Sequence, residues 1–205
     1  VEKINGLADE NNTSSVFSKR IVVSGDLGGT LVGCVLAKNG DFTDLPTTIH
    51  RLFEIFSEKI EVAEESIGDR VLEALATAKN YVLEQGLEAS FAICFFYQKA
   101  CFVVRFGEKV KVWTYRTGKS QELSFEYGSG PCTPGQFFVL GTEKFFTTFD
   151  TSALLVGDGL GLEEIIDGLA TDISSDEKQS EIGVAFVKIG SDDEKITEQV
   201  GNFEV

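Results

Sequence analysis

Residues 90–115, SFAICFFYQKACFVVRFGEKVKVWTY, decide the fold class of this chain of 205 residues. The stretch divides into three runs, 90–97, 100–106 and 109–115, each rich in β-branched and aromatic residues. Runs of this kind with very short connections are typical of neighbouring antiparallel strands. In the last run, apolar valines alternate with lysine, tryptophan and tyrosine, as in a strand with one buried face. The stretch therefore predicts consecutive antiparallel strands.

Two amphipathic helices are expected before these strands. The apolar residues of the first are spaced by three or four positions: Ile49, Leu52, Phe53, Phe56 and Ile60. Ser66 and Asp69 have the spacing of a capping box at the start of the second, and Gly86 is expected to end it. Each helix has a single apolar face, so each is expected to cover a sheet.

Further elements complete the predicted fold. Strands are expected at 20–23 and 30–36 before the helices, and a third amphipathic helix is expected after the central strands. The later elements are strands 121–127, 136–140 and 182–189 and helix 162–173. Strands and helices do not alternate, which excludes a βαβ fold. The prediction is an α+β protein, a four-layer αββα sandwich of two antiparallel sheets flanked by helices. Residues 1–190 form the domain, and 191–205 an acidic tail or linker.

Charge and hydropathy limit the partners. The formal net charge is −15, and nucleic acids and anionic membrane surfaces bind clustered Lys and Arg. No stretch approaches the roughly 18 consecutive apolar residues of a membrane span. We therefore expect a protein partner, no nucleic acid, no membrane insertion of this domain, and a cytoplasmic protein or the cytoplasmic part of a larger one.

Cysteine and histidine usage argues against a zinc site. The chain has one histidine, His50, and its four cysteines form no C-x-x-C pair. They are Cys34, Cys94, Cys101 and Cys132. If Gln98-Lys99 is a hairpin turn, Cys94 and Cys101 become diagonal neighbours on one sheet face. We expect buried free thiols in a reducing compartment.

Over roughly residues 5 to 190, the chain resembles the PPM-type (type-2C-like) metal-dependent protein serine/threonine phosphatases. Residues 89–113 resemble the family's hairpin passage from G-S-T-A to G-D-S-R. Residues 130–146 resemble the strand that delivers A-S-D-G-L-W-D, and 179–187 resemble the closing D-N-I-T strand. The resemblance rests on the order and spacing of these passages, and it implies the αββα fold.

The resemblance also implies where metal ligands would stand, because the family holds two Mg²⁺ or Mn²⁺ ions with carboxylates. The D-G-x-G-G turn aligns with residues 25–29, so Gly25 replaces the bridging Asp and Asp26 follows one position later. The early N-E-D falls near residues 11–13, where no carboxylate stands and Glu10 is the nearest.

Two later positions complete the comparison. Glu143 matches the Asp of S-D-G, while Ser180 matches the Asp of D-N with Glu181 beside it. Arg20 lies near the place of the family's phosphate-binding Arg. Asp26, Glu143 and Glu181 are thus candidate vestigial metal ligands, and no catalytic or other cofactor-binding residue is assigned.

The depleted acids favour a pseudophosphatase, a signalling or regulatory domain that binds a protein and needs no cofactor. The first alternative is an active or weakly active Mg- or Mn-dependent protein Ser/Thr phosphatase with a rearranged metal site. The second is an N-terminal nucleophile hydrolase, because residues 29–33, GTLVG, resemble a proteasome-type processing site. Cleavage before Thr30 would then expose its hydroxyl as the nucleophile.

Overall fold

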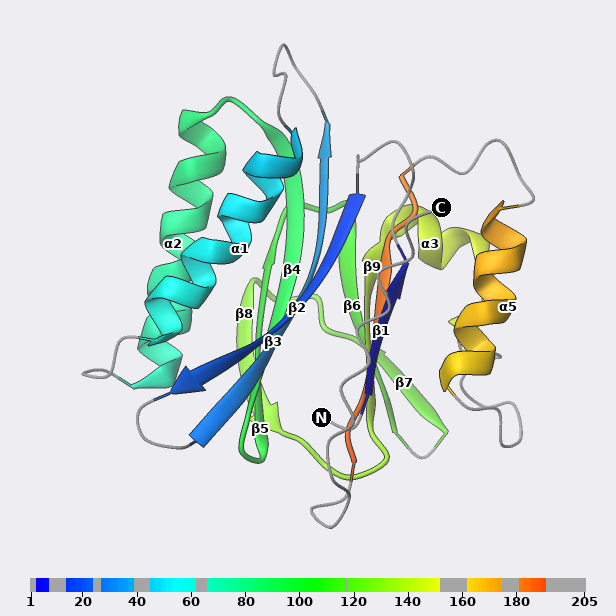
Figure 1. The fold of residues 1–205 in the computed structure, drawn as a ribbon. Helices are drawn as coiled ribbons and strands as arrows, with labels where there is room; N and C mark the ends of the chain where they lie inside the picture. The colour runs from blue at the N-terminus through cyan, green and yellow to red at the C-terminus, as the bar shows by residue number, and fades with distance from the viewer. Residues whose placement is uncertain are drawn as a thin grey trace.

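Two five-stranded antiparallel sheets form the centre of the protein (Figure 1). The computed structural model describes residues 3–7, 14–23, 27–38, 45–61, 66–116, 118–151, 162–174 and 181–190. Sheet B has the order β2 (Ser14–Val23), β3 (Leu27–Lys38), β4 (Glu88–Tyr97), β5 (Ala100–Phe106) and β8 (Tyr127–Pro131). Sheet A has the order β1 (Lys3–Leu7), β10 (Val184–Lys188), β9 (Phe137–Thr142), β6 (Val110–Arg116) and β7 (Lys119–Glu122).

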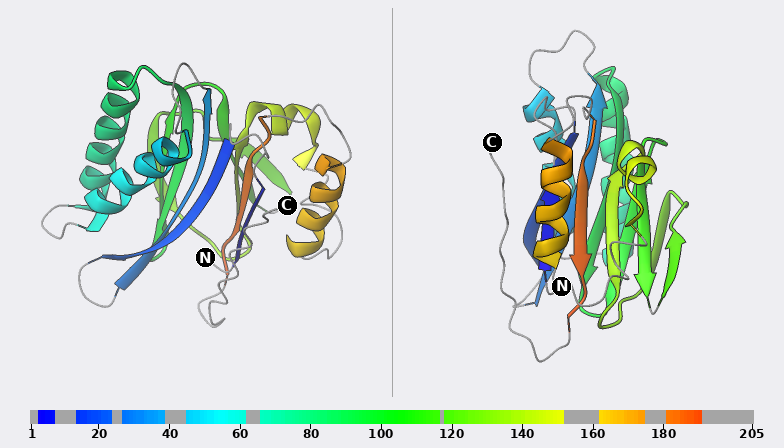
Figure 2. Two further views of the ribbon diagram at one scale, coloured as in Figure 1. Left: turned by 45° about the horizontal axis from the view of Figure 1, so that its top comes forward. Right: turned by 90° about the vertical axis from the view of Figure 1, so that its right-hand side faces the viewer.

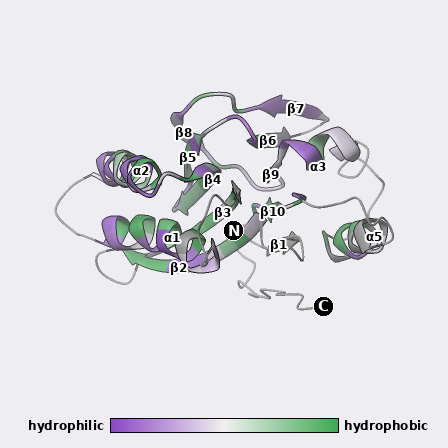
Figure 3. Cartoon of the chain, turned by 90° about the horizontal axis from the view of Figure 1, so that it is seen from above, coloured by the Kyte–Doolittle hydropathy of each residue, from purple (hydrophilic) through white to green (hydrophobic). Residues whose placement is uncertain are grey.

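Helices cover the outer faces of both sheets, as Figures 2 and 3 show. On sheet B lie α1 (Leu45–Glu61) and α2 (Ile67–Glu84), and on sheet A lie α3 (Glu143–Thr148) and α5 (Leu162–Ser174). The four-layer αββα sandwich predicted from the sequence is confirmed. No helix in the described ranges is both long and apolar enough to cross a membrane.

Three buried apolar layers hold the sandwich together. One lies between sheet B and its helices, and includes Phe56 and Phe91. The second lies between the sheets, where Val112 and Leu140 of sheet A meet Val32 of sheet B. The third joins the outer face of sheet A to α3 and α5. Burial of apolar surface on both faces of each sheet is the main stabilising contribution.

The predicted start and end of α2 are confirmed. Ser66 is its N-cap, and its Oγ accepts a hydrogen bond of 3.2 Å from the Asp69 N–H. Gly86 follows the C-cap residue with a φ of 62°, a left-handed conformation that glycine adopts without strain. The apolar stripe of α1 is buried as the spacing predicted.

Four expectations about elements were wrong or incomplete. Strand β1 and helix α3 were not predicted, and β2 begins at Ser14, six residues before the predicted start. The strand expected at 121–127 is instead the end of β7 and the start of β8, which belong to different sheets. The strand segments among them are polar or glycine-rich, so their strand character depends on pairing with neighbours more than on their own pattern.

Candidate functional site

One end of the sandwich brings the two sheets together through buried side chains. Here β2 begins, β9 ends and β10 begins, at the upper end in Figure 1. The Ser14 hydroxyl donates to the Ile182 carbonyl at 3.0 Å, and the Cys34 thiol donates to the Gly183 carbonyl at 3.7 Å. Residues of sheet B therefore bind the segment that leads into β10 of sheet A. We call this region the convergent end.

Thr142 is the central polar residue of the convergent end. It is completely buried, and its N–H donates to the Gly183 carbonyl at 2.9 Å. Its hydroxyl oxygen accepts from the Gly183 N–H at 3.3 Å and from the Phe145 N–H at 3.4 Å. The hydroxyl thus caps α3 and ties β9 to β10 at the same time.

Ser14 packs against Gly183 so closely that neither position has room for a larger side chain. Ser14 is 2% exposed, and a Cβ added at residue 183 would lie 2.9 Å from the Ser14 oxygen. The two hydroxyls at the convergent end are therefore neutral and tightly enclosed. No pattern in the sequence pointed to these two hydroxyls, apart from the capping position of Thr142 just before Glu143.

Glu143 begins α3, and its charge is already matched by a neighbouring lysine. Its carboxylate forms an ion pair of 3.1 Å with Lys111 Nζ, which projects from the adjacent strand β6. Its N–H donates to the Lys109 carbonyl at 2.7 Å, and Lys109 in turn forms an ion pair with Glu88. The side chain of Glu143 is 52% exposed, so water also screens it.

Glu181 lies at the same end of the molecule. It immediately precedes Ile182 and Gly183, the residues bound by Ser14 and Thr142, and has a left-handed φ of 73°. Glutamate adopts this conformation less readily than glycine, so the neighbouring contacts hold the turn in place. The structure thus places Glu143 and Glu181 at the convergent end.

Asp26 lies outside the described residues, but the strand ends that flank it are described. Val23 pairs with Leu27, whereas Ser14 pairs with Leu36, so the flanking pair lies nine residues along β2 from Ser14. At the rise of an extended strand, that is a separation of about 30 Å. Arg20 also lies well along β2 from the convergent end. The structure does not bring these flanking positions near Glu143 and Glu181.

The described residues at the convergent end do not fit a paired-metal centre. Mg²⁺ and Mn²⁺ prefer several oxygen ligands, including charged carboxylates. Within the described ranges, no group of three or more His, Cys, Asp or Glu side chains could hold a metal ion. The positions predicted near residues 10–13 and at Ser180 lie outside those ranges.

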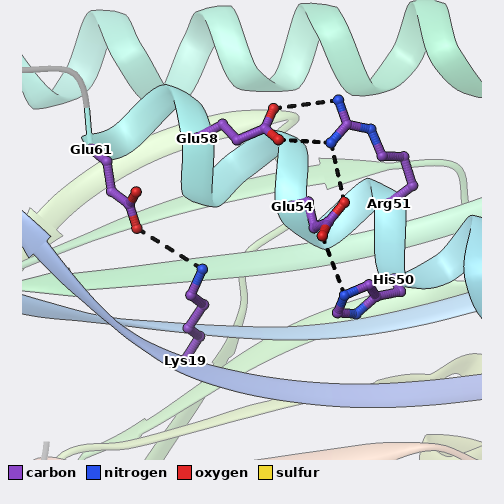
Figure 4. Close-up of polar contacts among 6 residues, drawn as sticks. All are labelled: Lys19, His50, Arg51, Glu54, Glu58 and Glu61. Carbon is purple, nitrogen blue, oxygen red and sulfur yellow. Dashed lines mark hydrogen bonds and ion pairs between the residues drawn. The ribbon is translucent and has the colours of Figure 1, made fainter.

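His50 belongs to a surface network of charges on α1 (Figure 4). It lies 3.4 Å from Glu54, while Arg51 contacts Glu54 at 3.1 Å and Glu58 at 2.7 Å. The hydrogen bond from Arg51 holds the pKa of Glu58 below its usual range. This network is exposed and pairs charges along one helix, as solvated helix faces do.

Thr30 is the fourth residue of β3. It pairs with Arg20 of β2 on one side and with Phe96 of β4 on the other. Cleavage before Thr30 would cut a strand that is paired along both edges. The strand position therefore gives no support to the N-terminal nucleophile alternative.

An open groove of about 840 Å³ lies at the other end of sheet B, away from the convergent end. It is bordered by the first turn of α2, the β4–β5 hairpin and β8. Its apolar lining includes Leu72, Tyr97, Phe102 and Tyr127. The groove and the convergent end share no residues.

No protein-family model and no curated protein sequence matches this chain. Its structure, however, is similar to solved serine/threonine phosphatases. The S. agalactiae serine/threonine phosphatase matches with a TM-score of 0.73 at 13% identity, covering 91% of this chain and 98% of that protein. PppA of Pseudomonas aeruginosa, a key regulatory component of T6SS, matches with a TM-score of 0.62 at 10% identity, covering 92% and 98%.

A third match was solved with metal. The catalytic domain of the serine/threonine protein phosphatase PstP, in complex with two manganese ions, has a TM-score of 0.61 at 9% identity, covering 87% of this chain and 98% of that domain. At such low identities the similarity establishes the arrangement of elements. This chain has the αββα fold of the PPM-type serine/threonine phosphatases.

Proposed function

We propose that this chain is a phosphatase-like domain that lacks two-metal catalysis and acts as a protein-binding, regulatory module. The observation that carries the proposal is the chemistry of the convergent end. Ser14 and Thr142 place neutral hydroxyls there, and the hydrogen bonds they form are internal to the protein. Such hydroxyls supply neither the charge nor the open coordination that a divalent cation needs.

Charge balance supports the same conclusion. Two divalent cations require several uncompensated carboxylates close together. Glu143 is compensated by Lys111, and Glu88 by Lys109, each through an ion pair. A cation arriving at Glu143 would therefore compete with the positive charge of Lys111.

The partner we propose is a protein with a basic surface, in the cytoplasm. The net charge of −15 attracts cations over the whole surface and repels nucleic acid and anionic lipid. The similarity to PppA, a regulatory component, agrees with a regulatory role. Binding to a basic partner is expected to weaken as the salt concentration rises.

The test is phosphatase activity measured together with metal binding. We expect no hydrolysis of p-nitrophenyl phosphate above the blank with excess Mn²⁺, and only millimolar or weaker Mn²⁺ binding by calorimetry. The catalytic domain of PstP, which was solved in complex with two manganese ions, is assayed in parallel as the positive control for both measurements.

A second candidate, a weakly active Mg- or Mn-dependent phosphatase, has one observation in its favour: Glu143 and Glu181 lie at the same end. It predicts tight, saturable Mn²⁺ binding and turnover that Glu143→Gln abolishes. Glu122→Gln, which changes a carboxylate paired with Arg105 elsewhere, is the matched control. Turnover that survives in Glu122→Gln and is lost in Glu143→Gln would establish the second candidate and refute the first.

A further inference from the structure

Three cysteine thiols form a row across neighbouring strands on the inner face of sheet B. Cys101 of β5 pairs with Phe96, so Cys94 of β4, two residues earlier, is its diagonal neighbour. On the other side Cys101 pairs with Gly130 of β8, which makes Cys132 the second diagonal neighbour. The diagonal placement of Cys94 and Cys101 was predicted from the hairpin turn and is confirmed. Cys132 was not expected to join them.

Cys101 lies next to both of the other cysteines on the same buried face of the sheet. The Cys132 N–H donates to the Lys99 carbonyl at 2.7 Å, which continues the β5–β8 pairing by one position and fixes the cysteine beside β5. Cys101 therefore lies between two possible sulfur partners.

The three differ in their access to solvent. Cys94 is completely buried and Cys101 is 3% exposed, whereas Cys132 is half-buried at the rim of the inter-sheet core. The hydrogen bond from Cys101 lowers the pKa of the Cys132 thiol, while burial raises the pKa of Cys101. The thiolate is the reactive form of cysteine, so the accessible member of the row is also the one most readily ionised.

We propose that Cys132 is a hydroperoxide-reactive thiol and that Cys101 resolves its oxidised form into an intramolecular Cys101–Cys132 disulfide. In the first step the Cys132 thiolate attacks one oxygen of hydrogen peroxide, the O–O bond breaks, and the departing hydroxide takes a proton to become water. This leaves a sulfenic acid on Cys132. In the second step the Cys101 sulfur attacks the sulfenic sulfur, the S–O bond breaks, and a second water leaves with the Cys101 proton. Two thiols and one peroxide thus give one disulfide and two waters.

The position of Cys132 gives the disulfide a structural consequence. The segment after Cys132 leads from sheet B to sheet A and is bound to the end of β10. The Gly135 N–H donates to the Ile189 carbonyl at 2.8 Å, and the Ile189 N–H donates to the Gln136 carbonyl at 2.9 Å. A Cys101–Cys132 bond would therefore join β5 covalently to a segment held by sheet A, at the end of the sandwich opposite Ser14. In a reducing compartment the bond would be reversible by thiol exchange.

The experiment treats the folded chain with hydrogen peroxide, blocks the remaining thiols with N-ethylmaleimide, and maps the products by mass spectrometry after digestion. We expect the alkylated thiols to fall from four to two, a loss of two hydrogens, and a peptide that joins Cys101 to Cys132 within one chain. Dithiothreitol should restore all four thiols.

Variants assign the two roles. Cys132→Ser should abolish the disulfide, whereas Cys101→Ser should leave a sulfenic acid at Cys132 that dimedone traps. Cys34→Ala is the matched control, because burial raises the pKa of Cys34 to about 12. Cys34 is a diagonal neighbour of Cys94, but it lies on β3, and β4 separates it from Cys101. It should oxidise at the wild-type rate, and circular dichroism checks that every variant is folded.

Mapping of the wild-type chain requires no variant, so the proposal can be overturned even if substitutions impair folding. Four unmodified thiols after peroxide treatment would overturn it. So would a Cys94–Cys101 bond, a Cys132–Cys132 bond between two chains, or sulfinic acid at Cys132 without a crosslink.

Discussion

The buried Thr142 side chain connects β10 to α3 through its hydrogen bonds. Loss of its hydroxyl should therefore lower the free energy of unfolding by a measurable amount. In Thr142→Val the shape is kept, but the Gly183 and Phe145 N–H groups lose their acceptor. We expect the free energy of unfolding to fall by about 1–2 kcal/mol in a urea titration. Thr148→Val removes an exposed hydroxyl that donates to the Lys144 carbonyl, and should change stability far less. Equal effects of the two substitutions would show that Thr142 has no special role.

The surface network on α1 makes a prediction about pH. Arg51 lowers the pKa of Glu58 below its unfolded value, so this pair stabilises the fold above the unfolded pKa. That contribution is lost as the pH falls through the lower, folded pKa. In an NMR titration, Arg51→Gln should move the Glu58 midpoint upward toward the value of a free glutamate. His50→Gln, which removes a contact to Glu54 and none to Glu58, should leave the midpoint in place. A Glu58 midpoint that does not respond to Arg51→Gln would contradict the assigned cause.

At the scale of elements, the close approach of α1 to sheet B requires a glycine in β3. A Cβ at Gly33 of β3 would lie 2.6 Å from the ring of Phe53 and 3.1 Å from Ile93. The Phe53 ring is buried and packs on Phe17 with centroids 4.8 Å apart, so it has little room to withdraw. We expect Gly33→Ala to cost about 1–3 kcal/mol of unfolding free energy through overpacking. Gly130→Ala, in β8 with no atom within 4 Å of the added Cβ, is the control and should be nearly neutral.

Elements with a strong pattern of their own could be predicted, and elements that depend on their neighbours could not. Helix α2 has an apolar stripe, an N-cap at Ser66 and a terminating Gly86, all of which lie within one short stretch of sequence. Strand β1 has the sequence KINGL, and it becomes a strand by pairing with β10, more than 170 residues later. Helix α3 is only six residues long, and Thr142 caps it from the end of β9. Too few residues define its apolar face for the period of a helix to be visible.

At the scale of the whole molecule, the order of elements was enough to predict the fold. The position of the candidate functional site could not be predicted in the same way, because it depends on which strand ends meet in space. The sequence places Asp26 beside a turn and Glu143 after a strand, without indicating that the strands flanking the turn point to the other end of the sandwich. The register of β2 against β3 supplies that information, and so do the bonds from Ser14 and Thr142 to the segment before β10. Lys111 reaches Glu143 only because β6 pairs with β9, a contact between residues that no local pattern connects.

The boundary of the domain can be tested by two truncations that differ by two residues. A chain that ends after Gly190 keeps Ile189, which is 8% exposed, packs in the core between the sheets and exchanges backbone hydrogen bonds with residues 135 and 136. We expect it to unfold at the same urea concentration as the full chain, because the acidic residues 191–205 are predicted to be a tail or linker. A chain that ends after Lys188 loses the isoleucine and both hydrogen bonds, and should be less stable by about 3–5 kcal/mol. If the chain that ends after Gly190 were less stable than the full chain, residues 191–205 would have to contribute to the folded domain. If the chain that ends after Lys188 were as stable as the full chain, the connection between β8 and β9 would not depend on Ile189. The predicted domain boundary at residue 190 would then have to move toward β10.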